Sequence, residues 1–164
     1  MGFLKDLGAG KVGENHVMDL LGKAGLNPQL NDKPKVNKWD IEFTFNNKLY
    51  TGEIKFDLYA TKSGNIAIEY YNPKSKVDSG VNATDAILWF HLLEGPKVHV
   101  CLVADLKKFL DEVLCDKHVK RGGQGGNSAM KLWQISNIFG PLMIEVDNSN
   151  ISDVLIKLLE ETCG

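Results

Sequence analysis

Polar and apolar residues alternate in two short segments, residues 38–43 and 51–56, on either side of the dipeptide Asn46-Asn47. A period of two is typical of a β-strand with one buried face. Asparagine tolerates the positive φ that a two-residue hairpin turn requires. The pattern therefore predicts a β-hairpin in which Phe45 faces Lys48 and Asp40 lies directly opposite Glu53.

The predicted hairpin contains a conflict of charge. Directly opposed side chains in an antiparallel pair have Cβ atoms about 4.5–5.5 Å apart, and like charges at that distance repel each other. Lys55 lies one alternation beyond Glu53 on the same face. Two opposed carboxylates beside a lysine are what a divalent metal site needs. The inference depends on the register, because a slip of one residue would place Asp40 and Glu53 on opposite faces.

The remaining segments alternate between helical and strand patterns. Apolar residues at helical spacing predict a helix over residues 14–24, ended by Gly25 and Pro28. Residues 65–71 predict a third strand, and Ser79 is expected to cap a helix over residues 81–93 that ends at Gly95-Pro96. Further predictions are a strand over 98–103, helices over 106–114 and 151–161, a strand over 131–135, and loops over 73–80 and 117–128.

This order of elements predicts one α/β domain, residues 1–164, built around a mixed central sheet that is flanked by helices. Its core is expected over residues 11–103 in the order α-β-β-β-α-β, with additions over 104–164. Alternation divides the three early strands into an apolar and a polar face. The polar face carries Asp40, Glu42, Glu53, Lys55, Asp57 and Glu69. A solvated sheet face is the simplest explanation of such a pattern, but carboxylates dominate this one.

Composition narrows the possibilities further. The chain has 164 residues, 43% hydrophobic and 24% charged, with a net charge of −2, so no overall basicity points to a nucleic-acid partner. Three cysteines without a Cys-x-x-Cys spacing argue against a disulfide framework or a zinc ribbon. No apolar run reaches the ~18 residues of a membrane span. We therefore expect a cytoplasmic protein.

The paired carboxylates have a specific chemistry. Carboxylate oxygens are hard ligands for Mg²⁺ or Mn²⁺, and a pair of them leaves positions open for phosphate oxygens and water. A neighbouring lysine can orient the attacking water and offset charge in the transition state. The combination of Asp40, Glu53 and Lys55 therefore indicates hydrolysis of a phosphodiester.

Asp40, followed after twelve residues by Glu53-Ile54-Lys55, resembles the D…ExK signature of the PD-(D/E)xK nuclease superfamily. Lys11-Val12-Gly13-Glu14 is similar to the Gly…Glu start of archaeal-type Holliday-junction resolvases and of phage endonuclease I. The segment from Gly64 to Tyr71, with Ser79-Gly80 and Thr84, resembles uncharacterised phage-encoded members. The chain departs from the superfamily at Trp39, where many members have proline, a position that is not a ligand.

The resemblance implies a restriction-endonuclease-like core and a Mg²⁺- or Mn²⁺-dependent endodeoxyribonuclease, in phage recombination or repair and in the host cytoplasm if the protein is phage-encoded. It also implies DNA as the substrate, with a preference for branched DNA such as a Holliday junction, and a homodimer. Asp40, Glu53 and Glu14 would bind the metal and Lys55 would position the water. Spacing places Glu14 on the inward face of its helix, although a first-turn acid also complements the helix dipole.

Other residues receive weaker assignments. Glu69 is expected to support the site as a further ligand or base, or else to pair with a surface lysine, whereas Glu42 and Asp57 are expected at the rim. Phosphate contacts are expected from the predicted loops, at Lys74, Lys76, Lys117, Lys120 and Arg121. Solvated loops explain these charges equally well. The competing functions are a non-catalytic nucleic-acid-binding module, a degenerate nuclease fold, or an interaction protein without affinity for DNA.

Overall fold

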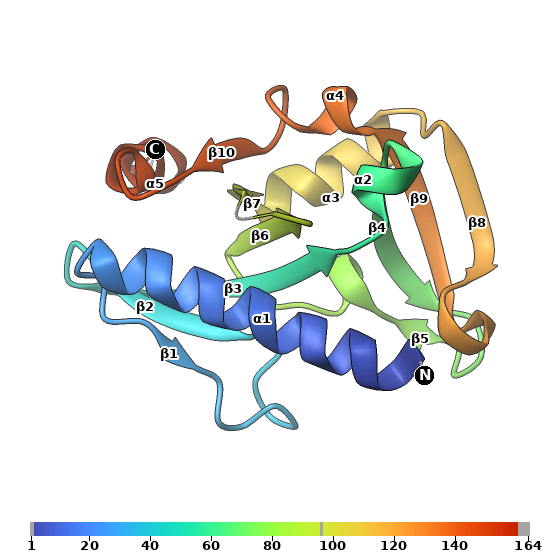
Figure 1. The fold of residues 1–164 in the computed structure, drawn as a ribbon, viewed down its shortest axis with the longest axis horizontal. Helices are drawn as coiled ribbons and strands as arrows, with labels where there is room; N and C mark the ends of the chain where they lie inside the picture. Colours follow the sequence, from blue (N-terminus) through green and yellow to red (C-terminus); the bar gives the residue numbers. More distant parts are fainter. Residues whose placement is uncertain (1, 96, 161–164) are drawn as a thin grey trace.

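Two β-sheets organise the computed structural model, which describes residues 2–95 and 97–160. The larger sheet has the order β1-β2-β3-β6-β7-β10, and the smaller has the order β5-β4-β9-β8 (Figure 1). The larger consists of β1 (Gln29–Leu30), β2 (Ile41–Phe45), β3 (Lys48–Asp57), β6 (Leu88–Leu93), β7 (Val98–Leu102) and β10 (Ile144–Val146). The smaller consists of β4 (Asn65–Asn72), β5 (Val77–Asp78), β8 (Lys117–Gly122) and β9 (Ser128–Gln134). The larger sheet is mixed, because β3 and β6 run parallel whereas its other pairs are antiparallel.

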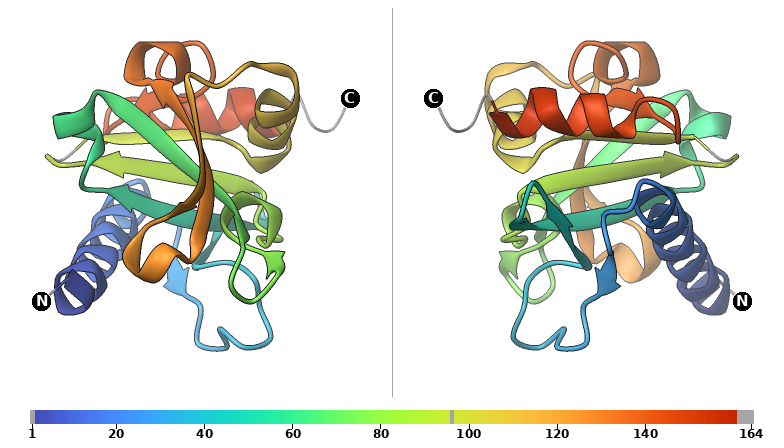
Figure 2. Two further views of the ribbon diagram at one scale, coloured as in Figure 1. Left: turned by 90° about the vertical axis from the view of Figure 1, so that its right-hand side faces the viewer. Right: turned by 90° about the vertical axis from the view of Figure 1, so that its left-hand side faces the viewer.

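Helices cover both faces of the larger sheet. They are α1 (Gly2–Lys23), α2 (Ala60–Ser63), α3 (Val103–Glu112), α4 (Ile135–Ile138) and α5 (Ile151–Glu160), with short 3₁₀ helices η1 (Gly80–Asn82) and η2 (Gln124–Gly126). Apolar residues of α1 and α5 form one core with Phe43 and Phe90. Residues of α3 form a second core with Trp89 and, from the smaller sheet, Trp133. The smaller sheet therefore packs on the face opposite α1, and its strands cross those of the larger sheet in Figure 2.

The predicted hairpin is confirmed. Asn46 and Asn47 have φ values of 48° and 60°, as a two-residue turn with two positive φ angles requires. The register runs from Phe45 opposite Lys48 to Ile41 opposite Gly52. Asp40 lies one residue before β2, and its N–H donates a hydrogen bond to the Gly52 carbonyl over 3.0 Å. The pairing that brings Asp40 beside Glu53 is therefore present.

The α/β class and the mixed central sheet flanked by helices are confirmed. The helix expected over 14–24 is the second half of α1, and Gly25 follows it with a φ of 74°. The segments expected over 98–103, 106–114, 131–135 and 151–161 correspond to β7, α3, β9 and α5, with residue 161 outside the described residues. No helix among residues 2–95 and 97–160 is long and apolar enough to cross a membrane.

The helix expected over residues 81–93 is wrong. Residues Leu88–Leu93 form β6, a central strand buried on both faces, and only η1 precedes it. A continuous apolar run without alternation cannot be distinguished from a helix by periodicity. Ser79 does not cap a helix, because its hydroxyl donates to Glu69 instead. Of the expected end at Gly95-Pro96, Pro96 lies outside the described residues.

The loop expected over residues 117–128 is also wrong. Residues Lys117–Gly122 form β8, the edge strand of the smaller sheet, which pairs with β9. Its side chains are mostly exposed, so the sequence has no alternation of polar and apolar residues that would predict a strand there. The strand expected over 65–71 is present as β4, but it belongs to the smaller sheet. In the larger sheet, β6 lies beside β3 instead.

Candidate active site

Asp40 and Glu53 come together at the start of the hairpin. The Asp40 carboxylate accepts a hydrogen bond from the backbone N–H of Ile54 at 2.8 Å, which holds it against the strand that carries Glu53. Burial raises the pKa of Asp40, and the bond from Ile54 opposes that shift. Burial, and next the charge of Asp40, raise the pKa of Glu53 to about 7. The conflict of charge that the register predicts is therefore present.

Lys55 offsets part of this conflict. It follows Glu53 by two residues on β3, so the two side chains share a face of the strand. The charge of Lys55 lowers the pKa of Glu53, although less than burial and Asp40 raise it. In the parallel register with β6, Lys55 lies opposite His91, a fully buried residue. Lys55 therefore shares the strand face of Glu53 and lies beside a buried position of β6.

Glu14 reaches the same region from α1. Burial, and next the charge of Asp40, raise its pKa, while Lys11 acts in the opposite direction. The preceding residue explains the approach of the helix, because a Cβ atom at Gly13 would lie 3.2 Å from the Cβ of Phe56. Gly13 thus allows α1 to pack closely on β3. The structure therefore brings Glu14, Asp40, Glu53 and Lys55 to one place.

No protein-family model matches the sequence, and no curated protein matches it. Among solved structures, the chain is similar to that of a bacterial homing endonuclease, I-Ssp6803I, with a TM-score of 0.50 and 17% identity. The match covers 73% of this chain and 86% of the endonuclease.

The two chains share a fold. At 17% identity, the similarity to the homing endonuclease concerns the path of the chain and carries no residue-by-residue roles. In the solved protein, this fold belongs to a homing endonuclease. The chemistry of this chain must therefore be argued from its own side chains.

Thr84 belongs to the site although sequence analysis gave it no role there. Its hydroxyl lies 2.8 Å from Oε2 of Glu53, and the two residues are separated by 31 positions in the chain. Thr84 itself is buried, in the segment between η1 and β6. No spacing rule connects residues so far apart. The prediction of a helix over 81–93 also excluded the turn in which Thr84 lies. The contact became visible only with the fold.

Glu69 is not brought to the site. It lies on β4 of the smaller sheet, where its carboxylate accepts hydrogen bonds from the hydroxyls of Ser79 at 2.6 Å and Ser128 at 2.8 Å. Within the described part of the chain, no hydrogen bond or ion pair connects it to Asp40 or Glu53. These contacts connect β4 to β9 and to the start of η1. They explain the position of Glu69 by a structural role, without a catalytic one.

Asp57 is not a rim charge, contrary to the expectation. It is buried, with 7% of its surface exposed, at the end of β3. Its carboxylate accepts backbone N–H bonds from Tyr59 and Ala60 at 3.1 Å and from Ala67 at 3.3 Å, and Nε2 of His91 lies 3.6 Å away. Asp57 therefore holds the first turn of α2 and the start of β4 against the larger sheet.

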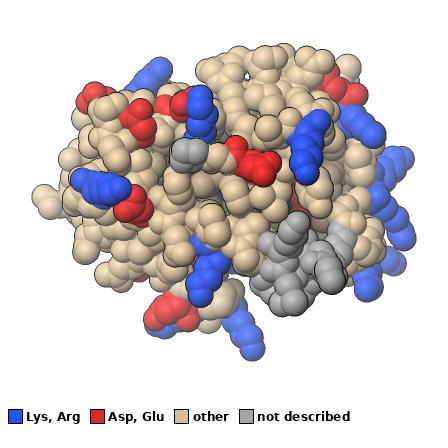
Figure 3. All heavy atoms as spheres, viewed as in Figure 1, with Lys and Arg blue, Asp and Glu red and all other residues tan. Residues whose placement is uncertain are grey.

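The basic residues expected to contact phosphate all lie on the smaller sheet. Lys74 and Lys76 are exposed in the turn between β4 and β5, and Lys117, Lys120 and Arg121 are exposed on β8. Figure 3 shows Lys and Arg side chains gathered along the margin where β8 lies in Figure 1. The sheet order places these two groups at opposite edges, with β4 and β9 between them.

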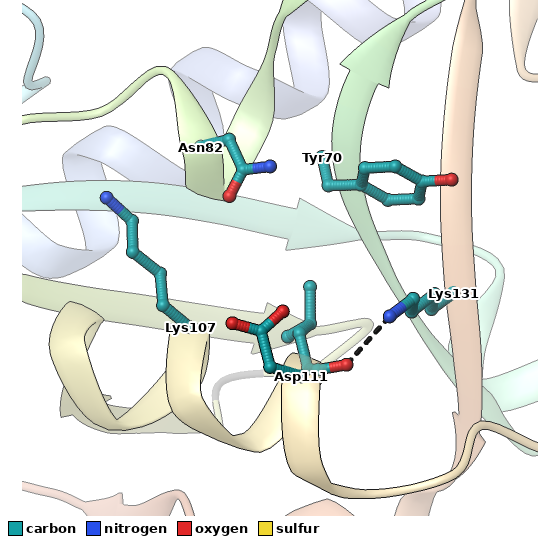
Figure 4. Close-up of a pocket in the computed structure, with 6 residues that line it drawn as sticks. Tyr70, Asn82, Lys107, Asp111 and Lys131 are labelled. Carbon is teal, nitrogen blue, oxygen red and sulfur yellow. Dashed lines mark hydrogen bonds between the residues drawn. The ribbon is translucent and has the colours of Figure 1, made fainter.

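A cavity of about 390 Å³ lies apart from the carboxylates, between β4, α3 and β9 (Figure 4). Tyr70, Asn82, Lys107, Leu110, Asp111 and Lys131 line it. The Lys131 ammonium donates to the Leu110 carbonyl at 2.7 Å, near the carboxyl end of α3. Cations commonly stabilise that end of a helix, so a structural role accounts for this lysine.

The residues present fit a divalent cation bound through few protein ligands. No three His, Cys, Asp or Glu side chains in residues 2–95 and 97–160 form a ready cage for a metal. Asp40 and Glu53 instead provide two hard oxygen donors under mutual repulsion, and positive charge would relieve that repulsion. A small number of carboxylates is typical of Mg²⁺, which retains several waters or substrate phosphates.

Proposed function

We propose that the protein is a metal-dependent endodeoxyribonuclease with a PD-(D/E)xK site. The observation that carries the proposal is the opposed pair Asp40 and Glu53, with Lys55 on the same strand face and the pKa of Glu53 raised to about 7. A stable fold gains nothing from this desolvated pair, whereas binding of a cation makes use of it. The shared fold with a homing endonuclease supports the same class of reaction.

Each residue has a defined part in the proposed hydrolysis. Asp40 and Glu53 would hold Mg²⁺ or Mn²⁺, with Glu14 in support, and the cation would supply positive charge to the phosphate. Lys55 orients the attacking water and offsets negative charge as the phosphorus–oxygen bond to the leaving group breaks. Water supplies the oxygen of the new phosphate end, and the leaving oxygen takes up a proton.

DNA is the proposed substrate, and the smaller sheet is the proposed binding surface. The exposed cations of β8 and of the β4–β5 turn suit a phosphate backbone, because contacts between Lys or Arg and phosphate provide most of the non-specific affinity. A preference for branched DNA, a role in phage recombination or repair, and a homodimer complete the proposal. These features come from the resemblance to junction resolvases.

Cleavage assays test the proposal directly. Wild-type protein is incubated with four-way junction, nicked, linear and single-stranded DNA, with Mg²⁺, with Mn²⁺ or with EDTA. We expect cutting of at least one substrate with a metal and none with EDTA. Asp40→Asn should abolish cutting, whereas Asp19→Asn, which removes an exposed carboxylate paired with Lys23, should not. A wild type that cuts none of these substrates with either metal contradicts the proposal.

A second candidate is a nucleic-acid-binding module without catalysis. The observation that favours it is the distribution of exposed cations over the smaller sheet, away from the carboxylates on the hairpin. It predicts salt-sensitive DNA binding that survives the loss of Asp40, Glu53 and Lys55. The assays above separate the two candidates, since only the nuclease cuts.

A further inference from the structure

Thr84 makes three polar contacts through one hydroxyl. The backbone N–H of Ala86 donates to its oxygen at 3.1 Å, as in a local turn of serine or threonine. The carbonyl of Lys38 lies 2.9 Å away and Oε2 of Glu53 lies 2.8 Å away. With only 5% of the surface of Thr84 exposed, its hydroxyl has little access to water as an alternative hydrogen-bond partner. The buried hydroxyl thus connects two loops to the carboxylate.

A hydroxyl has one proton and two lone pairs. The Ala86 N–H uses one lone pair, so the Lys38 carbonyl and the Glu53 carboxylate compete for the single proton. The Lys38 carbonyl has a second donor in the backbone N–H of Asp85, at 2.9 Å. Among the described residues, Glu53 receives a side-chain hydrogen bond from Thr84 and from no other group. The carboxylate therefore depends on this hydroxyl more than the carbonyl does.

A purely structural role explains only part of this arrangement. The hydroxyl would stabilise the turn at Ala86 and bind the Lys38 carbonyl even if no carboxylate were nearby. The contact with Glu53 adds a restraint on a flexible side chain, in a place where its partner Asp40 repels it. Because the hydroxyl bonds to Oε2, it leaves Oε1 as the oxygen without a side-chain hydrogen bond in the described structure.

We propose that Thr84 is a positioning residue that holds the Glu53 carboxylate in one orientation beside Asp40, and so increases the affinity of the site for a divalent cation. The inference rests on the proposed function. It assigns to the turn before β6 a part in the site that neither the hairpin nor α1 supplies. A hydrogen bond to a charged group contributes enough to make its loss measurable.

Binding of Mn²⁺ to the protein without DNA tests this role by titration calorimetry. Thr84→Val keeps the shape of the side chain and removes the hydroxyl, and we expect about tenfold weaker binding. Thr84→Ser keeps the hydroxyl and should bind within about threefold of wild type. Thr51→Val is the matched control. Thr51 lies on β3, the strand that carries Glu53, and its hydroxyl accepts a hydrogen bond from the Ile87 N–H at 3.2 Å without contacting Glu53. It should leave Mn²⁺ binding unchanged.

A cycle with Glu53→Gln separates positioning from general destabilisation. In the Glu53→Gln background, Thr84→Val should alter Mn²⁺ affinity less than about twofold, because the carboxylate that it orients is gone. Thermal unfolding of each variant checks folding, and Thr84→Ala replaces Thr84→Val if the latter does not fold. Wild-type Mn²⁺ affinity in the folded hydroxyl-free variant overturns the inference.

The outcomes also distinguish this inference from the proposed function. A wild type that neither binds Mn²⁺ nor cuts DNA overturns both. A wild type that binds and cuts, while folded Thr84→Val does so equally well, overturns only the role of Thr84. Weakened binding that Thr84→Ser does not restore also contradicts the inference, because a hydroxyl at this position would then be insufficient.

Discussion

The carboxylate of Asp40 accepts a hydrogen bond from the backbone N–H of Ile54, across the hairpin and 2.8 Å away. Ile54 lies between Glu53 and Lys55 in the chain, so this one bond places Asp40 beside both. It also explains how the fold tolerates two neighbouring acids, since a backbone donor stabilises the ionised form of one of them. The remaining unfavourable charge falls on Glu53.

Glu53 should make the metal-free protein less stable as the pH rises. Its pKa of about 7 in the folded state lies above the ordinary value of 4.5, so the folded protein binds more protons between these pH values. The contribution of Glu53 to the free energy of unfolding should therefore fall from pH 4.5 to pH 7, by up to about 3 kcal/mol, and change little above. His99, whose pKa burial lowers to about 4, contributes in the opposite direction, so the effect of Glu53 is the difference between wild type and Glu53→Gln. Urea unfolding in EDTA across this range measures the slope.

Glu53→Gln should remove the fall that Glu53 causes, because the amide does not ionise, so its stability relative to wild type should increase from pH 4.5 to pH 7. Asp19→Asn, at the exposed pair with Lys23, should retain it. An unchanged slope in Glu53→Gln would show that other groups cause the pH dependence. Added Mg²⁺ should stabilise the wild type more at pH 8 than at pH 5, since the cation competes with the proton for the same carboxylate.

Lys55→Ala should lower the rate of DNA cleavage by about 10²–10⁴-fold, the range for a group that takes part in proton transfer or charge stabilisation. DNA binding should remain within about threefold of wild type, because in the proposed mechanism Lys55 acts on the attacking water and does not bind the DNA backbone. Lys97→Ala is the control, since Lys97 is exposed and pairs with Glu145 at 3.3 Å. Single-turnover cleavage and binding by fluorescence anisotropy measure the two effects. Equal rates in Lys55→Ala and wild type would remove Lys55 from the mechanism.

The double substitution Lys120→Ala with Arg121→Ala should weaken DNA binding and reduce its dependence on salt. Each lost phosphate contact lowers the slope of log K against log[salt] by about 0.9, so the double variant should lose about 2. The matched control replaces Lys23 and Lys97, which lie on α1 and in the β6–β7 turn. A slope equal to that of wild type would exclude β8 from the interface.

Gly13→Ala should disturb the site, whereas Gly8→Ala should not. A Cβ atom at Gly13 would meet the Cβ of Phe56 at 3.2 Å, and at Gly8 it would meet nothing within 4 Å. Both glycines lie in α1, where alanine is favoured by about 1 kcal/mol. We expect Gly8→Ala to raise the unfolding temperature and Gly13→Ala to lose that gain, with reduced cleavage because Glu14 shifts. Equal stabilisation by both variants would show that α1 does not need this close approach.

The sequence predicted the part of the site that is local in the chain. Asn46 and Asn47 determined the turn, the alternation determined the register, and Asp40 met Glu53 as a result. The contacts that sequence reasoning missed are non-local or lack a polarity pattern. β6 is buried on both faces, β8 is mostly exposed on both, and Thr84, in the segment before β6, meets Glu53 across 31 positions of the chain.

Asp57 gives the molecule a fixed internal spacing. By bonding to the first turn of α2 and to Ala67 of β4, it holds the two sheets together through a connection of only a few residues. The larger sheet, which carries the hairpin, and the smaller sheet are therefore joined by a short connection that Asp57 anchors. If DNA lies along the smaller sheet, the phosphate that reaches the carboxylates lies at a constant distance from the DNA segment that the smaller sheet binds. The cut would then fall at one fixed offset from the protected footprint on every substrate, whatever its sequence.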